Sequence, residues 1–186
     1  MDEYTPNRGA YLNEKMISGY YIGEMCRLLM IEVFRERITD LGEESLLNER
    51  WRFTSEMVSE VLRFGTDYEG LLELVTQRSA DMAATCLTAV FEKSGIFTTS
   101  KADDWILREK GTFTLSEEYT KDPSKKITVG VDGSVYIKIP GYEQRMKETI
   151  SRILDTEIGS RVDLVHSEDG SGKGAALAVA ALVNDE

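Results

Sequence analysis

The apolar positions in the first part of the chain repeat with the period of an α-helix. Seven of them fall at i, i+3, i+4, i+7, i+8, i+11 and i+12: Ile22, Met25, Cys26, Leu29, Met30, Val33 and Phe34. This spacing predicts a strong amphipathic helix after a turn at residues 7–9. Gly19 and Gly23 lie near its beginning, and each costs about 1 kcal/mol of helix propensity relative to alanine. We therefore expect a close contact that compensates for them.

Further helical patterns fill the sequence up to Gly95. Four apolar positions predict a short helix with Thr54 and Ser55 as capping residues in its first turn: Phe53, Met57, Val61 and Leu62. A capping box at residues 66–69 predicts a helix that begins at Thr66. A second helix should follow, with Gly95 just after its C-cap and five residues on its apolar face: Ala83, Cys86, Leu87, Val90 and Phe91.

Residues 127–186 carry a mixed pattern. Residues 127–131 and 135–139 are β-rich, and the Asp132-Gly133-Ser134 segment between them contains an Asp-Gly pair, which favours a hairpin. An amphipathic helix at residues 142–154, a strand at 162–165 and an alanine-rich helix follow. The predicted order is β-β-α-β-α. It follows a mainly helical segment, residues 1–95, and a surface excursion, residues 96–126, all in one domain.

The stretch from Ser167 to Gly174, SEDGSGKG, separates the last strand from the last helix. Its glycines let a ligand approach the backbone closely, and the free N–H groups at a helix N-terminus suit a phosphate. The spacing is neither that of a Walker loop nor that of the dinucleotide-binding fingerprint. Two interpretations stay open: a phosphate site, or a tight turn whose glycines allow close helix packing.

Composition and charge narrow the function classes. The chain is 41% hydrophobic and 30% charged, as in ordinary globular proteins. A net charge of −11 argues against nucleic acid or an anionic membrane as the main partner. There is no leader-like apolar region at the N-terminus and no apolar run of about 18 residues, the length that a membrane span needs. We therefore expect a cytoplasmic protein without membrane contact from this segment.

The chain has too few cysteines and histidines for a histidine-based metal cluster or a disulfide framework. Cys26 and Cys86 both fall on the apolar face of a predicted helix, so they are interpreted as buried, reduced thiols. His166 is the only histidine, which excludes a histidine-based metal cluster, and no Cys/His pair is expected. Glu168 and Asp169 are adjacent in a loop, where such carboxylates are usually solvated. The sequence predicts no metal site and no tightly bound cofactor.

Several blocks of the chain resemble, in order, the C-terminal part of the eukaryotic hexokinases and glucokinases. The first block contains Asn7, Gly9, Glu14 to Gly19, Tyr21, Gly23-Glu24 and Arg27-Leu28. A looser match covers residues 53–59, and a short one covers residues 78–80. The most specific matches are residues 127–136, ITVGVDGSVY, and residues 167–177, SEDGSGKGAAL. Between these blocks, residues 35–52 align poorly with the family, and residues 96–126 are longer and different in character.

The resemblance implies an α/β fold, the incomplete large domain of the actin-like ATPase (ribonuclease H-like) fold. It also implies the C-terminal part of an ATP-dependent hexose kinase that converts glucose to glucose 6-phosphate, with glucose or another hexose and ATP/ADP as ligands and Mg entering with ATP. Glu14, which by its position alone would serve the helix dipole, is implied to bind glucose hydroxyls. The implied ATP-binding residues are Gly19, Tyr20, Ser55, Ser59, Asp132, Gly133, Ser134, Val135, Gly170, Ser171 and Gly172.

The chain departs from the family pattern at several places. Arg8 replaces a proline, and Asn13 replaces the aromatic residue before the sugar-binding glutamate. The D-x-G-G-T-N phosphate loop and the asparagine-aspartate segment with the catalytic base do not occur in these residues.

The resemblance therefore implies that the family's catalytic aspartate would lie before Met1. We expect no catalytic residue in this chain and no activity of the chain alone. The alternative is a truncated, non-catalytic relative that binds nucleotide or acts in regulation. The two interpretations differ in whether the natural polypeptide starts at Met1 or continues upstream into the missing motifs.

Overall fold

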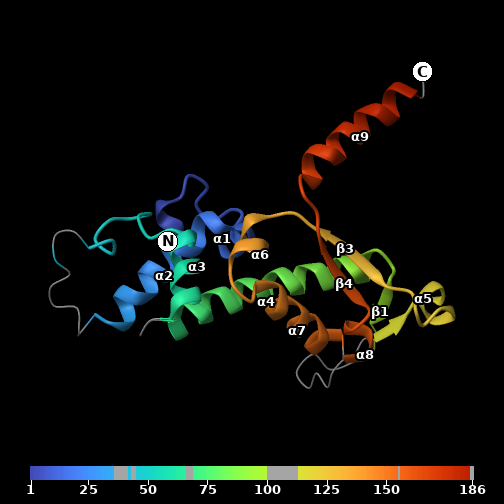
Figure 1. Ribbon diagram of the computed structural model, residues 1–186, viewed down its shortest axis with the longest axis horizontal. Helices are drawn as coiled ribbons and strands as arrows, with labels where there is room; N and C mark the ends of the chain where they lie inside the picture. Colours follow the sequence, from blue (N-terminus) through green and yellow to red (C-terminus); the bar gives the residue numbers. More distant parts are fainter. Residues whose placement is uncertain (36–41, 43–44, 66–68, 100–112, 155, 185–186) are drawn as a thin grey trace.

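The computed structural model describes residues 1–35, 42, 45–65, 69–99, 113–154 and 156–184. Its longest element is α4 (Glu69–Lys93), which runs through the middle of the molecule (Figure 1). The other helices are η1 (Asp2–Tyr4), α1 (Leu12–Ile17), α2 (Gly19–Val33), α3 (Ser55–Phe64), α5 (Glu117–Lys121), α6 (Ser134–Lys138), α7 (Tyr142–Leu154), α8 (Thr156–Gly159) and α9 (Gly170–Asn184). The strands are β1 (Phe97–Thr99), β2 (Phe113–Leu115), β3 (Ile127–Val131) and β4 (Val162–His166).

Helix α4 packs against two groups of elements. α1, α2 and α3 pack against it, with α1 reaching Cys86 in its C-terminal half, and α7 runs alongside it (Figure 1). Seven of its residues are buried at spacings of three or four: Leu72, Thr76, Ser79, Ala80, Ala84, Thr88 and Phe91. Because this buried face continues without a helix breaker, the two helices predicted here are one. The predicted start at Thr66 lies outside the described residues.

The C-terminus of α4 confirms the role predicted for Gly95. Its φ of +77° is left-handed, a conformation that glycine adopts without steric cost. The Gly95 N–H donates to the Glu92 carbonyl at 3.0 Å, and the Ile96 N–H donates to the Phe91 carbonyl at 3.0 Å. These two bonds form a Schellman motif and turn the chain into β1, which pairs antiparallel with β2.

The long amphipathic helix predicted near the N-terminus is broken at Ser18. The Ser18 side chain accepts a hydrogen bond from the Tyr20 N–H at 3.4 Å and caps α2. Four residues after Gly19, a Cβ on Gly23 would lie 2.1 Å from the Phe53 carbonyl oxygen. The expected close contact is therefore present: α2 passes directly against the backbone that leads into α3, and only glycine leaves the space.

The predicted hairpin is wrong. β3 pairs in parallel with β4, with Ile127 opposite Val162, and residues 134–138 form helix α6. Tyr136 and Ile139, three residues apart, are buried while Ile137 is 53% exposed, which is helical and not alternating burial. The β-branched run was a weaker signal than this tertiary packing, because β4 supplies the partner that β3 requires and the Tyr136 hydroxyl donates to the Leu164 carbonyl at 3.4 Å.

The two cysteines differ in their surroundings. Cys26 is fully buried in α2, and burial raises the pKa of its thiol to about 12. Cys86 is exposed, so its predicted burial is wrong. The buried face of α4 passes instead through Ala84 and Thr88, and Cys86 lies to one side of that face. Both thiols are free. Among the described helices, none combines the length and apolarity needed to cross a membrane.

Candidate functional site

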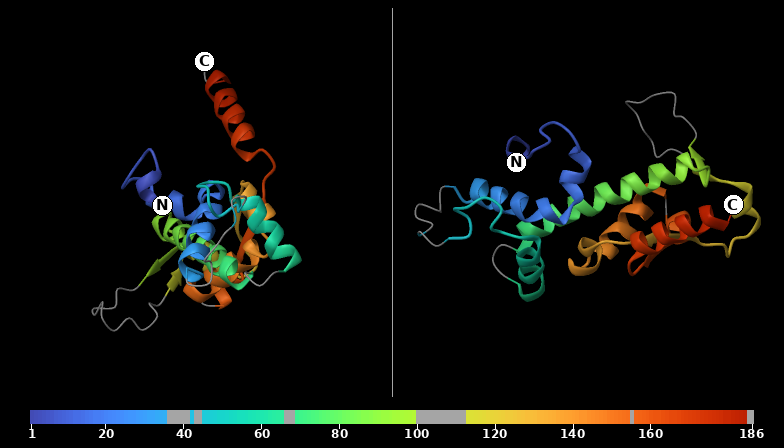
Figure 2. Two further views of the ribbon diagram at one scale, coloured as in Figure 1. Left: turned by 90° about the vertical axis from the view of Figure 1, so that its left-hand side faces the viewer. Right: turned by 90° about the horizontal axis from the view of Figure 1, so that it is seen from above.

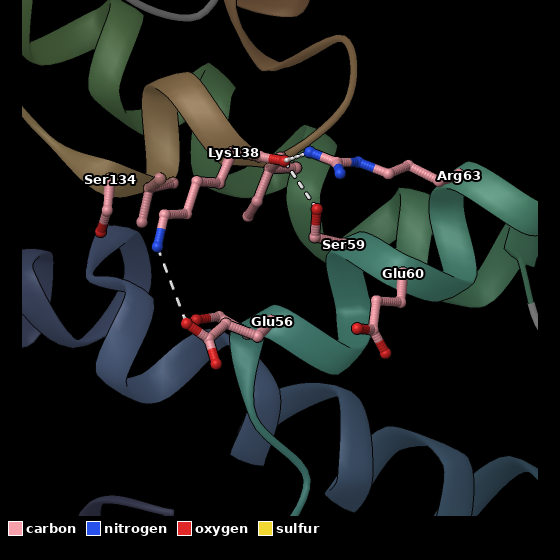
Figure 3. Close-up of a pocket in the computed structure, with 9 residues that line it drawn as sticks. Glu56, Ser59, Glu60, Arg63, Ser134 and Lys138 are labelled. Atoms are coloured by element: carbon pink, nitrogen blue, oxygen red, sulfur yellow. Dashed lines mark hydrogen bonds and ion pairs between the residues drawn. The ribbon is translucent and has the colours of Figure 1, made fainter.

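A cavity of about 350 Å³ lies between α3 and α6 (Figure 3). Helix α3 contributes one wall because its positions 55, 56, 59, 60 and 63 share a face, and α6 contributes the other wall. The lining residues are Ser55, Glu56, Ser59, Glu60, Arg63, Ser134, Val135, Lys138 and Ile139. Four residues implied to bind ATP, which come from two segments far apart in the sequence, therefore surround one cavity: Ser55, Ser59, Ser134 and Val135.

The backbone carbonyl of Lys138 fixes the two walls to each other. It accepts a hydrogen bond from the Ser59 hydroxyl at 2.6 Å and one from the Arg63 guanidinium at 3.3 Å (Figure 3). At the opposite side of the cavity the Lys138 ammonium lies 3.7 Å from the Glu56 carboxylate. Both of these side chains are largely exposed, so the ion pair adds little stability, but it places opposite charges at the rim.

Gly19 brings a third helix to the cavity. A Cβ on this residue would lie 2.9 Å from Val135 Cγ2 and 3.5 Å from Ser55 Oγ. Gly19 is the first residue of α2, so the N-terminus of this helix lies next to the two cavity walls. Three residues implied to bind ATP thus meet at one point, each from a different helix.

Tyr20, the next residue, is 71% exposed and belongs to an aromatic cluster. Its ring stacks on Trp51 with centroids 5.3 Å apart, and Tyr21 meets both rings edge-on. Trp51 has a φ of +67°, in the left-handed region that is unfavourable for a bulky residue. The backbone N–H of Trp51 donates to the Glu24 carboxylate at 2.8 Å, and this bond holds the strained backbone in place.

Glu24 is the centre of a buried ion pair. Its carboxylate is 1% exposed and accepts two hydrogen bonds of 2.7 Å from Arg27, which in turn donates to the Leu47 carbonyl at 2.7 Å. Burial alone would raise the pKa of Glu24, but the bonds from Arg27 and from the Trp51 N–H lower it overall. The pair ties residues 47–51 to α2. The sequence indicated Glu24 and Arg27 only as members of the first block that resembles the family.

A second group of site residues gathers at the carboxyl ends of β3 and β4. Because these strands are parallel, the loops that follow them emerge at the same edge of the sheet, where open α/β sheets bind ligands. A Cβ on Gly170 would lie 2.8 Å from Ser167 Oγ and 3.6 Å from Asp132 Cβ. Gly133 follows Asp132 and leads into α6, so this edge adjoins the helix that forms one cavity wall.

Gly172 lies in the first turn of α9, with Ser171 beside it. A Cβ there would lie 2.5 Å from an Asp169 carboxylate oxygen, and around Gly174 there is open space. Neither Gly172 nor Gly174 contacts a neighbouring helix among the described residues. The interpretation that these glycines allow close helix packing therefore has no contact to support it here. Gly172 and Gly174 both have a helical backbone, and the lack of a Cβ at Gly172 avoids crowding with the flexible Asp169 side chain.

Glu14 lies in the first turn of α1, with its side chain exposed. Two contacts hold this short helix in place. The buried Lys15 ammonium lies 2.6 Å from the Asp2 carboxylate, which lowers the pKa of Asp2, and the Asn13 amide donates to the Cys86 sulfur at 3.1 Å. Asn13 therefore turns toward α4, and Glu14 is left free to point to solvent from a fixed helix.

The first residues of the chain form a small folded segment next to α1. The Met1 carbonyl accepts a hydrogen bond from the Tyr4 N–H at 3.0 Å, and Met1 is the N-cap residue of η1. Asp2, the first residue of η1, is also the carboxylate that pairs with Lys15. The segment therefore supports the helix that carries Glu14. The catalytic aspartate expected before Met1 has no position in this sequence, and it stays a prediction.

The cavity includes residues that the sequence did not indicate. Glu56, Glu60 and Arg63 share the face of Ser59 on α3, so the predicted helix could have found them by spacing alone. Lys138 and Ile139 could not be found in this way. The hairpin interpretation placed both on a strand, and only the packing of α6 against α3 brings them to the cavity.

Comparison with known proteins identifies the family. The model of the hexokinase family matches residues 1–69 and 68–181. Human hexokinase-2 is 32% identical to this chain over an alignment that covers 97% of the chain. The chain belongs to the hexokinase family. It spans 19% of human hexokinase-2 and 36% of hexokinase-1 from Schizosaccharomyces pombe, to which it is 29% identical. It therefore corresponds to a fraction of these hexokinases.

Solved hexokinase structures share the fold. One hexokinase crystal structure superposes with a TM-score of 0.68 at 25% identity, covering 97% of this chain and 39% of the other. A hexokinase from Schistosoma mansoni, solved in complex with glucose, gives a TM-score of 0.67 at 25% identity and is matched over 38% of its length. The predicted fold class, an α/β fragment of the actin-like large domain, is confirmed.

Proposed function

We propose that this hexokinase chain supplies nucleotide and sugar contacts for the transfer of a phosphoryl group from ATP to a hexose, with glucose giving glucose 6-phosphate. The observation that carries the proposal is the meeting of Gly19, Ser55 and Val135 beside a cavity of about 350 Å³. Ligand pockets for small molecules begin at about this size. The three residues come from three helices and from distant parts of the sequence. A ligand bound in the cavity would contact all of them.

The cavity suits the nucleoside part of ATP. Hydroxyl groups of Ser55, Ser59 and Ser134 line it, and Val135 with Ile139 supplies apolar surface for a base. The phosphates are assigned to the helix N-termini at Gly19 and at Gly170–Gly172, where the positive end of the helix dipole favours negative charge. Mg enters with ATP as part of the co-substrate and neutralises phosphate charge during transfer. In this proposal the protein's own contribution is positioning.

Glu14 is proposed to hold the sugar. An exposed carboxylate on a helix fixed by Lys15 and Asn13 can accept charge-assisted hydrogen bonds from sugar hydroxyls, each of about 1.5 to 3 kcal/mol. The schistosome relative was solved with glucose bound, which supports a hexose as ligand. When the chain is joined to the N-terminal portion of a hexokinase, Glu14→Ala should raise the KM for glucose at least tenfold and change the KM for ATP only a few fold.

A second function rests on a sequence observation. The 186 residues contain the segments that form the cavity but neither the D-x-G-G-T-N loop nor the asparagine-aspartate segment with the base that deprotonates the sugar hydroxyl. A chain that works by itself would then be a nucleotide-binding or regulatory relative. Incubating the chain with MgATP and glucose distinguishes the two functions from a self-sufficient kinase: glucose-dependent ADP release by the purified chain would contradict both.

The nucleotide assignment is tested by filling the cavity. Ser134 is exposed, begins α6 and lines the cavity, so Ser134→Leu should block the ligand without disturbing the core. Thr156→Leu is the matched control, because Thr156 is also exposed and also begins a short helix, α8, away from the cavity. We expect Ser134→Leu to weaken MgATP binding in calorimetry at least tenfold and the control to leave it unchanged. Equal affinity in both variants, or no binding by the unmodified chain, would refute the assignment.

A further inference from the structure

A second cavity, of about 330 Å³, lies where α1, α2 and α4 meet. The three helices pack against one another, and they come together in Figure 1 and in the right view of Figure 2. Five apolar side chains line this cavity: Met16, Met25, Leu28, Leu29 and Val75. Two charged residues, Glu32 and Arg78, complete the lining. The cavity shares no residue with the one between α3 and α6, so it is separate from the nucleotide site proposed above.

The lining follows from the residue spacing on α2 and α4. Four lining residues fall at i, i+3, i+4 and i+7 of α2 and share one face: Met25, Leu28, Leu29 and Glu32. Val75 and Arg78, three residues apart on α4, share a face in the same way. The five apolar residues are half-buried, whereas the neighbouring face of α2 with Ile22, Cys26 and Met30 is buried. The cavity therefore presents a second apolar face of α2, which the core covers only in part.

The walls suit a small apolar ligand. Pockets for such ligands have volumes of about 300 to 1,000 Å³ and are lined mainly by apolar side chains, with a few polar groups that fix the orientation. A volume of about 330 Å³ is near the lower limit of this range, so a slender molecule fits better than a broad one. Met16 and Met25 have flexible, polarizable side chains that adapt to the shape of a ligand. An acyl chain is both slender and apolar.

The charged residues at the cavity favour a ligand with one negative end. Glu32 is already paired, because its carboxylate lies 2.5 Å from the Arg35 guanidinium. Arg78 is exposed, and among the described residues it has no hydrogen bond or ion pair, although the chain carries a net charge of −11. A guanidinium stays charged at any physiological pH and can bind a carboxylate through two parallel N–H bonds. Arg78 can therefore hold a carboxylate at one end of the apolar cavity.

We propose that this cavity binds the carboxylate form of a medium-chain fatty acid, with the acyl chain between α2 and α4 and the carboxylate on Arg78. Each methylene group that leaves water for the apolar walls should raise the affinity by a factor of about four. The carboxylate supplies the partner that Arg78 lacks among the described residues. Arg78 lies in the short family match at residues 78–80, and the nucleotide and sugar proposals do not use it. The inference is therefore independent of both.

Calorimetric titration of the 186-residue chain with decanoate tests the proposal. Below its micelle concentration, decanoate should bind at one site per chain. Octanoate, which is shorter by two methylene groups, should bind about 15-fold more weakly. Titration of the same samples with MgATP reports on the nucleotide site separately, so failure of one site is distinguished from failure of the other. Lack of saturable decanoate binding by the unmodified chain would overturn the proposal.

Two pairs of variants locate the ligand. Arg78→Gln removes the charge at the cavity, and Arg52→Gln removes an exposed charge that does not line it. Val75→Phe fills the cavity, and Leu74→Phe enlarges the adjacent residue, which is 65% exposed and lies outside the lining. Arg78→Gln and Val75→Phe should each weaken decanoate binding at least tenfold. The two controls should leave the affinity unchanged.

The same variants define the contrary results. Equal affinity in Arg78→Gln and Arg52→Gln would overturn the assignment of the carboxylate, and this comparison stands even where Val75→Phe fails to fold, because Arg78 is exposed. Equal affinity in folded Val75→Phe and Leu74→Phe would place the acyl chain elsewhere and overturn the proposal too. Light scattering of the free chain tests the other occupant. A dimer that Val75→Phe dissociates and that decanoate does not affect would assign the cavity to a second copy of the chain.

Discussion

Val135 Cγ2 lies 2.9 Å from the point where a Cβ on Gly19 would stand. Gly19 begins α2 and Val135 is the second residue of α6, and the contact brings the helix N-terminus at Gly19 to the cavity wall at Val135. The neighbour is the end of a side chain and not a backbone atom. Val135 is the only one of the two neighbours that is too close, since Ser55 Oγ lies at an ordinary contact distance of 3.5 Å, so shortening Val135 should restore the space.

The first prediction tests this relationship by a double-mutant cycle. Gly19→Ala should overpack the contact and cost about 1 to 3 kcal/mol of the free energy of unfolding. For a chain of this size each kcal/mol corresponds to about 2–4 °C in Tm. Val135→Ala in the same protein should recover most of that loss because it removes the two methyl groups. Thermal melts of the four proteins measure the coupling, and strictly additive losses would show that the two residues do not press on each other.

The second prediction concerns Gly23, whose neighbour is backbone. A Cβ there would lie 2.1 Å from the Phe53 carbonyl oxygen, so Gly23→Ala forces α2 and the chain before α3 apart. We expect a loss in Tm larger than that of Gly19→Ala, without rescue by side-chain truncation. Gly70→Ala in α4 is the control, since open space surrounds Gly70 and alanine favours a helix by up to about 1 kcal/mol. A Gly23→Ala protein as stable as Gly70→Ala would contradict the close contact.

The third prediction concerns the buried ion pair. The pKa of Glu24 is lowered in the folded protein, so its ionised form contributes stability at neutral pH that is lost as the pH falls through the folded pKa. Glu24→Gln leaves Arg27 buried without its charge partner, which should cost roughly 3 to 5 kcal/mol at pH 7. The difference in unfolding free energy between the two proteins should shrink as the pH is lowered, because Glu24 itself becomes neutral.

Glu143 provides the control for this pair. Its carboxylate lies 2.5 Å from the Lys147 ammonium, and this contact lowers its pKa too, but both side chains are substantially exposed. Glu143→Gln should therefore change the free energy of unfolding by no more than about 1 kcal/mol at pH 7. Urea denaturation at several pH values measures both variants. Equal effects of the two substitutions would show that burial does not strengthen the Glu24–Arg27 pair.

The fourth prediction distinguishes the two thiols. Burial and a pKa raised to about 12 should keep Cys26 from reacting with a thiol reagent at pH 8, because the thiolate is the reactive form. Cys86 is exposed and should react. A colorimetric disulfide reagent should therefore titrate one thiol in the folded chain and two in guanidinium. Cys86→Ser should abolish the reaction of the folded chain, and a second reactive thiol there would mean that α2 opens readily.

Local signals in the sequence were sufficient for several elements. The period of α2, the cap at Thr54 and the left-handed Gly95 at the end of α4 depend on neighbours within a few residues, and all three are present in the structure. The order of strand, turn and helix around residues 167–174 was also predicted, but the predicted glycine turn is wrong in its bounds: the turn is residues 167–169, and the three glycines lie in the first turns of α9. Such features are local in origin, so the sequence alone determines them.

Long-range packing decided the rest. Three of residues 135–139 are β-branched and the segment follows an Asp-Gly pair, yet residues 134–138 form α6. The reason is that β4 occupies the edge of β3 and that the core accepts Tyr136 and Ile139 on one helical face. The cavity could be predicted only in part. The family resemblance indicated four of its lining residues, but Lys138 was not among them and lies at the cavity because its carbonyl contacts Ser59 on α3. A strand partner or a cavity wall that lies many residues away leaves no periodic pattern in the sequence. The free energy of such a contact depends on the tertiary structure that brings the two segments together.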